Sequence, residues 1–264
     1  MNNRTLQQSA LTLVLGLALA IGALARPAPA PQPQPESTKQ PTVYTYVSLF
    51  GVPRANWTQY EAADKNSAKI MAGLVADGTL ISWGNGALEV HEGLNAPTHV
   101  SWFSSMSVAG LMKALAAVRA GAPPSGEINY TMHADEIQMS TNYNAKPGAA
   151  PGKYLLVQEW KPKAGHGDEM TELFNKHRKP DLDALVADGT ITSYSWGTDL
   201  IHTDTPGTVS LAVEFPSAEA MDKFYGQIVT MQDKNPLFGV AFSSVTEGAE
   251  HRDHLLRILD SGHK

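Results

Sequence analysis

The chain contains no cysteine, and this absence excludes several kinds of chemistry. Disulfide bridges, cysteine-ligated iron–sulfur clusters and thiolate nucleophiles all require a thiol. Basic residues are also in the minority, because 20 Lys and Arg stand against 26 Asp and Glu, which gives a formal charge of −6. Nucleic acids and anionic membrane surfaces bind basic faces, so we expect neither as a partner.

Several nucleotide and catalytic motifs are missing as well. The sequence has no P-loop, no GxGxxG fingerprint and no GxSxG nucleophile elbow. A metal site needs three or four converging ligands, and no HxxxH or HxH cluster supplies them locally. We therefore predict no metal and no cofactor. Haem remains an alternative, because it needs only one axial histidine and the chain has several.

The long apolar run lies at the N-terminus. Ala10–Ala25 follows Arg4 and ends in Ala23-Leu24-Ala25, the small-x-small pattern of a signal peptidase site. The run is shorter than the roughly 20 apolar residues that a membrane-spanning helix needs. We interpret residues 1–25 as a bacterial signal peptide and expect an exported protein, periplasmic or secreted, without a membrane partner after cleavage. An uncleaved membrane anchor is the alternative.

Residues 26–41 alternate proline with small and polar residues. Such a composition disfavours helix and sheet and predicts an extended, semi-rigid spacer. The chain that follows is long enough to bury a core without disulfides.

The hexapeptide LVADGT occurs twice, at Leu74–Thr79 and again 111 residues later at Leu185–Thr190. The match continues, because Ser82 and His91 have counterparts in Ser193 and His202 at the same spacing. Further on, Val100-Ser101 aligns with Val209-Ser210 after a shorter turn. A repeat of this length predicts two copies of one small domain, which we place at residues 42–145 and 152–260.

Both copies have the same predicted order of elements. A strand at residues 42–50 or 153–160 precedes a helix at 57–76 or 168–187, and Pro180 should split the second helix. Gly78 and Gly189 are predicted left-handed caps. Two strands follow, then a helix near 108–119 or 218–232 and a strand near 133–141 or 251–259. The order β-α-β-β-α-β is that of a ferredoxin-like unit, so the fold class is α+β.

The repeated LVADGT junctions, the strands of His91 and His202, and the closing strands HADEI and HRDHL carry a resemblance. The chain resembles the dimeric α/β-barrel superfamily, with the dimer fused into one polypeptide. It is also similar to a group of exported bacterial proteins whose function is unassigned. The resemblance implies that the two units pack sheet to sheet. Because the fused halves cover each other, we expect a monomer.

The alternation of side chains along the strands predicts a polar and aromatic pocket between the two sheets. Glu214 should point into it, and a carboxylate there can serve as an acid–base group. Trp83, His91 and His202 are predicted on the same inward face, as is His99. A one-sided site of His99 and Glu214 is therefore possible, and Trp83 can stack a planar ligand.

Two further histidines precede acids by two residues, His133 before Asp135 and His251 before Asp253. Residues i and i+2 of a strand share a face, so each carboxylate can orient its imidazole. A strand-end salt link is the structural alternative. His254 has the opposite parity and should face the helices or solvent.

Four functions are compatible with these patterns. The first is a small-molecule binding protein, whose predicted ligand contacts are Trp83, His91, His99, His202, Glu214, His251 and Asp253. The second is a cofactor-free monooxygenase or isomerase acting on a small aromatic substrate. The third is a haem protein and the fourth an interaction module. The sequence leaves open whether the protein is an enzyme.

Overall fold

The computed structural model describes residues 40–90, 96–121, 128–201 and 207–264. The predicted signal peptide, most of the proline-rich spacer, His91 and His202 lie outside these residues. Within them, no helix is long and apolar enough to cross a membrane.

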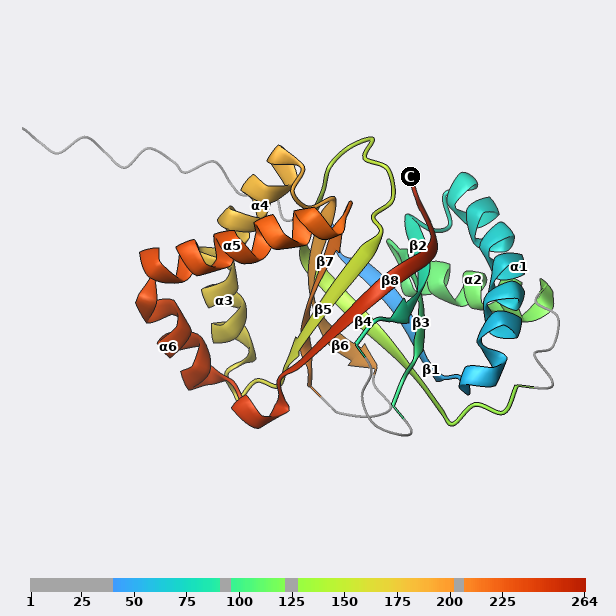
Figure 1. Ribbon diagram of the computed structural model, residues 1–264, viewed down its shortest axis with the longest axis horizontal. Coiled ribbons are helices and arrows are strands. Elements are labelled where there is room, and N and C mark those ends of the chain that lie inside the picture. The colour runs from blue at the N-terminus through green and yellow to red at the C-terminus, as the bar shows by residue number, and fades with distance from the viewer. Residues whose placement is uncertain (1–39, 91–95, 122–127, 202–206) are drawn as a thin grey trace, which may run out of the picture. The chain divides into compact units, whose positions relative to one another are not determined.

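Eight antiparallel strands form one closed barrel in the order β1-β3-β2-β8-β5-β7-β6-β4 (Figure 1). The strands are β1 (Val43–Gly51), β2 (Ser82–Leu88), β3 (His99–Ser105), β4 (Met132–Ala145), β5 (Tyr154–Trp160), β6 (Ser193–Ile201), β7 (Val209–Phe215) and β8 (Arg252–His263). The first four strands follow one another in the order β4-β1-β3-β2, and the last four in the order β8-β5-β7-β6.

The barrel differs from the predicted pair of stacked sheets, because the two sheets are hydrogen-bonded at both edges. β4 and β8 extend beyond their predicted ends, to 14 and 12 residues. Each pairs with its own half and with the other half: β4 with β1 and β6, and β8 with β5 and β2. The long closing strands thereby satisfy edges that would otherwise be open.

Helices cover the outer face of the barrel on two sides (Figure 1). They are α1 (Trp57–Ala76), α2 (Val108–Gly121), α3 (Gly167–His177), α4 (Lys179–Asp188), α5 (Ala218–Lys234) and α6 (Pro236–Val245), with short 3-10 turns at Arg54–Asn56 and Gly248–Glu250. α1 and α2 pack on the first half, and α3 to α6 on the second.

The helix boundaries follow the local signals closely. α1 has the predicted bounds, and Pro180 in the first turn of α4 accompanies the predicted break after α3. Gly78 and Gly189 both have positive φ, at 80° and 78°, where other residues are strained. α6 was not predicted, although Pro236 at its start is a favourable first helical residue.

The strand registers show that some side chains point to the face opposite to the predicted one. Tyr44 opposes Ser105, and Tyr154 opposes Phe215. With these registers, Val100 occupies the position in the first half that Ser210 occupies in the second. The sequence alignment matches Val100 with Val209, one residue earlier. A shift of one residue moves every side chain of a strand to the other face. The predicted orientations are therefore right for β7 and wrong for β3.

Candidate functional site

Two cavities lie on opposite faces of the barrel strands. The barrel cavity, of about 370 Å³, is inside the barrel. The helix-covered cavity, of about 470 Å³, lies outside it, between α1, α2 and the outer face of the first-half strands. The predicted pocket corresponds to the barrel cavity, whereas the helix-covered cavity was not predicted.

The helix-covered cavity is lined by polar side chains from several elements. Asp64 projects from α1, Trp83 and Asn85 from β2, and His133 and Asp135 from β4. Strand alternation places Trp83 and Asn85 on one face, two residues apart. Aromatic rings complete the walls, including Tyr46 and Phe103, which stack with centroids 5.0 Å apart.

Three of the residues that line this cavity each carry a buried polar atom with no hydrogen-bond partner among the described residues. The atoms are Asp64 Oδ2, Trp83 Nε1 and Asn85 Oδ1. Trp83 is 6% exposed and Asn85 4% exposed. An unpaired buried polar atom costs free energy, and most such atoms in folded proteins are paired. The cavity wall thus includes residues with one unused donor and two unused acceptors.

Asp64 is electrostatically unusual. Burial, together with the nearby charges of Asp260 and Glu61, raises its pKa from 3.8 to about 7. Such a carboxyl group is partly ionised near neutral pH, the range in which a general base works best.

At the edge of the same cavity, β4 carries the predicted histidine–carboxylate pair. His133 Nε2 lies 3.1 Å from Asp135 Oδ1, and the Ser48 hydroxyl donates to the same oxygen over 2.6 Å. The His133 ring stacks on Phe50 with a centroid distance of 4.7 Å. Burial and the hydrogen bond to Asp135 raise the pKa of Tyr46 to about 12, so this phenol stays protonated.

The second half is filled at the equivalent positions. Because Asn85 opposes Ser101 and Trp196 opposes Leu211, Trp196 and Leu211 are the counterparts of Asn85 and Ser101. Both second-half residues are 3% exposed and belong to the hydrophobic core. The Trp196 indole stacks on Phe174 at 4.2 Å. The first half thus has polar groups and a cavity where the second half has packed aromatic and aliphatic side chains.

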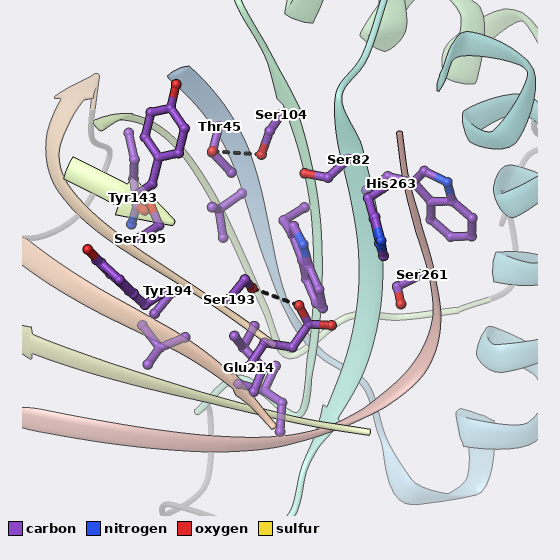
Figure 2. A pocket seen from close by; sticks show the side chains of 18 of the residues that line it. Thr45, Ser82, Ser104, Tyr143, Ser193, Tyr194, Ser195, Glu214, Ser261 and His263 are labelled. Carbon is purple, nitrogen blue, oxygen red and sulfur yellow. Dashed lines mark hydrogen bonds between the residues drawn. The ribbon is translucent and has the colours of Figure 1, made fainter. Parts of the chain in front are cut away.

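Glu214 lines the barrel cavity, as the sequence predicts (Figure 2). Its carboxylate accepts hydrogen bonds from the Gly152 amide over 2.6 Å and the Ser193 hydroxyl over 2.8 Å. On a neighbouring part of the wall, the hydroxyls of Thr45 and Ser104 are 2.8 Å apart.

Glu136 is a second acid of the barrel cavity, and the sequence interpretation missed it. Burial, with the charges of Asp199 and Glu159, raises its pKa to about 8. The alternation in HADEIQ was the available signal, because an outward Asp135 implies an inward Glu136.

His254 also lines the barrel cavity, where it lies 3.6 Å from Glu159 Oε2. The prediction that His254 faces the helices or solvent is therefore wrong.

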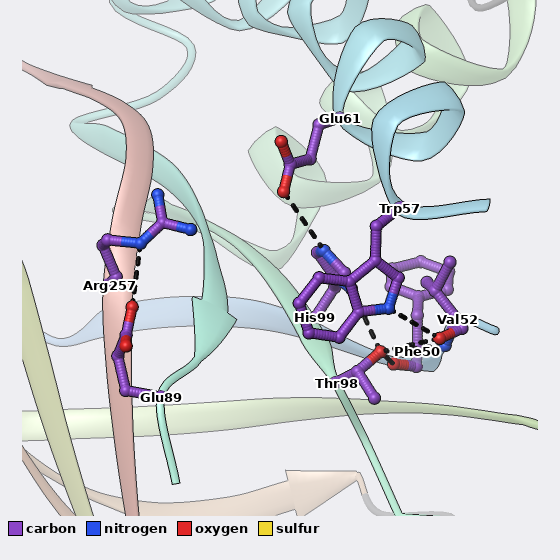
Figure 3. Close-up of polar contacts among 8 residues, drawn as sticks. All are labelled: Phe50, Val52, Trp57, Glu61, Glu89, Thr98, His99 and Arg257. Carbon is purple, nitrogen blue, oxygen red and sulfur yellow. Dashed lines mark hydrogen bonds and ion pairs between the residues drawn. The ribbon is translucent and has the colours of Figure 1, made fainter. Parts of the chain in front are cut away.

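His99 does not share a face with Glu214. It is fully buried under α1, where its Nε2 lies 3.8 Å from Glu61 Oε1 and its Nδ1 3.0 Å from the Thr98 hydroxyl (Figure 3). The edge of the Trp57 ring packs against it. Since Glu214 points into the barrel, a joint site of His99 and Glu214 is ruled out. The contacts of His99 connect α1 to β3.

Trp83 belongs to the core beneath α1 and lines both cavities, so it does border the predicted pocket. The inward positions of β2 include Gly84, where a Cβ atom would overlap the Trp102 indole. The small residue provides room for the Trp102 indole, which also lines the barrel cavity.

His251, directly before β8, and Asp253 at its start form the predicted pair, with Nε2 and Oδ2 3.4 Å apart. His251 Nδ1 donates to the carbonyl of Glu159 over 2.8 Å, and its ring stacks on Trp160 at 5.1 Å. These contacts fix the imidazole at the start of the strand. In the described part of the chain, no group of three or more His, Asp or Glu residues is arranged to hold a metal ion.

No protein-family model and no curated protein sequence matches the chain. Solved structures, however, are similar in fold. A candidate monooxygenase from Lactobacillus acidophilus has 10% identity and a TM-score of 0.61, over 84% of this chain and 96% of its own. A candidate monooxygenase from Fusobacterium nucleatum has 11% identity and a TM-score of 0.57, over 85% and 95%.

An anthrone oxidase-like protein is also similar, with 13% identity and a TM-score of 0.54, over 85% of this chain and 94% of its own. At these identities the likeness establishes the fold. Together with the closed eight-stranded barrel, it shows that this chain has the dimeric α/β-barrel fold, as the internal repeat predicts.

Proposed function

We propose that the protein is a cofactor-free oxygenase that acts on a small hydroxylated aromatic substrate in the helix-covered cavity. The observation that carries this proposal is that three residues lining one cavity with aromatic walls each carry an unpartnered buried polar atom: Asp64 Oδ2, Trp83 Nε1 and Asn85 Oδ1. The names of the three similar structures are compatible with such an activity.

Each polar atom has a defined role in the proposed site. Trp83 Nε1 donates to a carbonyl or phenolate oxygen of the substrate, and Asn85 Oδ1 accepts from a hydroxyl group. Asp64 accepts the proton that leaves the substrate, since its pKa of about 7 suits proton transfer at neutral pH. The resulting electron-rich anion reacts with dioxygen directly. For a methylene substrate, the carbon loses two hydrogens and gains one oxygen atom, and the other oxygen atom leaves as water.

The contrast between the two halves supports this assignment. The first half carries buried Asn85 and partly buried Ser101 where the second carries buried Trp196 and Leu211. A polar cavity reduces stability, because buried polar groups need partners and cavities lose packing contacts. The packed core at the equivalent positions of the second half is consistent with a division into one functional half and one structural half.

Oxygen consumption by the full chain with anthrone as the probe tests the proposal. We expect uptake of dioxygen with formation of the quinone, and a decrease in kcat of roughly a hundredfold or more in Asp64→Asn. Asp222→Asn, at an exposed position of α5, is the matched control and should keep full activity.

Other outcomes of this experiment contradict the proposal. Binding of hydroxylated aromatics without oxygen uptake would support a binding protein instead. A Soret band in the purified protein would support the haem alternative. Unchanged kcat in Asp64→Asn would remove Asp64 from the reaction.

We also infer that residues 42–145 and 152–260 are two ferredoxin-like units that arose by duplication. Both halves have the same strand order. Both also place a histidine ring, His133 or His251, in a stack on an aromatic residue of the neighbouring strand, Phe50 or Trp160. Because the two units complete one closed barrel, we propose a monomer, which the mass in solution tests.

Export remains part of the proposal. Residues 1–25 have the features of a signal peptide, and residues 26–41 those of an extended spacer. Mass spectrometry of the protein from a bacterial envelope fraction tests this, since cleavage removes the N-terminal residues through Ala25. An intact N-terminus would favour a membrane anchor.

A further inference from the structure

The barrel cavity has no role in the proposed reaction, yet its wall has the composition of a binding site. An interior formed by eight strands is normally filled by side chains or holds one small ligand. Here the inward positions of neighbouring strands carry small residues, including Ser104, Ser193 and Ala212, and about 370 Å³ stays open. The cavity is therefore large enough for a small organic molecule.

Part of the cavity wall is apolar. Leu88, Val100 and Leu256 form a buried cluster. Partly buried apolar side chains from the facing strands pack against this cluster: Val47, Leu49, Trp102, Leu155 and Val157. Contact with these surfaces would remove apolar ligand area from water, at about 25 cal/mol per Å².

One end of the cavity carries an excess of negative charge. Glu136 projects from β4 and Glu159 from β5, and Asp199 on β6 acts on Glu136 electrostatically. Glu136 accepts a hydrogen bond from Gln138 over 2.7 Å, and Glu159 lies 3.6 Å from His254 of β8. Among the side chains known to interact with Glu136 here, two are acids, Asp199 and Glu159, and His254 is the one base.

The opposite end has a different charge pattern. Glu214 accepts two hydrogen bonds there, and His263 and Lys264 of the C-terminus also line the cavity. The two ends are therefore chemically distinct, and a ligand with one charged group has a preferred orientation.

We propose that the barrel interior is a second binding site, which takes a small apolar molecule with an ammonium group. The apolar body contacts Val47, Val157 and Leu256, and the ammonium group lies at the end that carries Glu136 and Glu159. A cation there offsets the mutual repulsion of the carboxylates. The attraction between opposite charges is stronger inside a protein than at its surface, because the effective dielectric constant is lower.

The raised pKa of Glu136, about 8, agrees with this assignment, because the local protein charges leave its ionised form poorly stabilised. Binding of a cation favours the ionised form. Affinity should therefore rise from about pH 6 to about pH 9, as Glu136 loses its proton.

Calorimetric titration of the full chain with hexylammonium, 1-hexanol and hexanoate tests the proposal. The three probes share an alkyl chain and differ in charge. We expect hexylammonium to bind most tightly and hexanoate most weakly. Glu159→Gln, which keeps the side-chain shape, should weaken hexylammonium binding roughly tenfold or more and leave 1-hexanol binding unchanged. Glu172→Gln, on the exposed side of α3, is the matched control.

A second pair of variants locates the site. Ala212→Leu adds volume inside the barrel and should abolish binding of hexylammonium and 1-hexanol. Asn85→Leu adds volume to the helix-covered cavity and should leave both unchanged. The proposal is overturned if hexylammonium does not bind, if hexanoate binds equally well, or if Asn85→Leu rather than Ala212→Leu removes binding.

Discussion

Replacing Asp64 by asparagine should make the protein more stable, although it removes the proposed general base. Asp64 is part of α1, and its carboxyl group is buried near the acids Glu61 and Asp260. Its pKa is raised from 3.8 to about 7. A raised pKa means that the folded protein disfavours the ionised form. The cost begins as the pH rises above the unfolded-state pKa and is fully present above the folded-state pKa.

The magnitude follows from the displacement of the pKa. About three units correspond to a cost of about 4 kcal/mol at pH 8, and about 1.5 kcal/mol at pH 5. Asparagine avoids this cost but adds an amide donor that needs a partner, which takes back roughly 1 to 3 kcal/mol. We therefore expect Asp64→Asn to gain roughly 1 to 3 kcal/mol at pH 8, and little or nothing at pH 5.

Urea denaturation at pH 5 and pH 8 measures the effect, and thermal melting should show a rise of several degrees at pH 8. Asp222→Asn, at an exposed site, controls for the loss of one negative charge from a protein of net charge −6. If Asp64→Asn is no more stable than the wild type at pH 8, or gains equally at both pH values, Asp64 is not a destabilised acid. A gain in stability combined with lost turnover is the signature of a site that sacrifices stability for function.

The structure makes three further predictions. Glu136→Gln should raise the free energy of unfolding more at pH 9 than at pH 5, because the carboxyl group, with a pKa of about 8, ionises at a cost as the pH rises. Equal denaturation midpoints of variant and wild type at both pH values would contradict this. Trp196→Ala should cost roughly 3 to 5 kcal/mol in urea denaturation, because the ring is 3% exposed and stacked on Phe174; a loss below about 1 kcal/mol would show that this half is not tightly packed. Gly189→Ala should lower the free energy of unfolding by roughly 1 kcal/mol, because φ at this position is 78°. Gly73→Ala, inside α1 with open space around its Cβ position, should raise it by up to roughly 1 kcal/mol. A loss of stability at both positions would refute the assignment of the left-handed cap.

Only part of the candidate site could be predicted from the sequence. The i, i+2 spacing of His133 and Asp135 predicted their contact correctly, because alternation in a strand is a local property. The sequence also indicated the inward direction of Glu214, since its neighbours Val213 and Phe215 alternate cleanly with polar residues. Asp64 gave no such signal, because on a helix it looks like any solvated acid.

Local sequence signals were enough for the α+β class and for the order of the elements other than α6. Helix caps at Gly78 and Gly189, the break near Pro180 and the repeated LVADGT junction all depend on interactions between residues close in the chain. The tertiary structure decided which face of β2 and β3 lines the barrel, because pairing register depends on partner strands far away, and a slip of one residue inverts the face. It also decided that Asp64, Trp83 and Asn85 line one cavity, since burial and raised pKa values arise when α1 packs on the sheet.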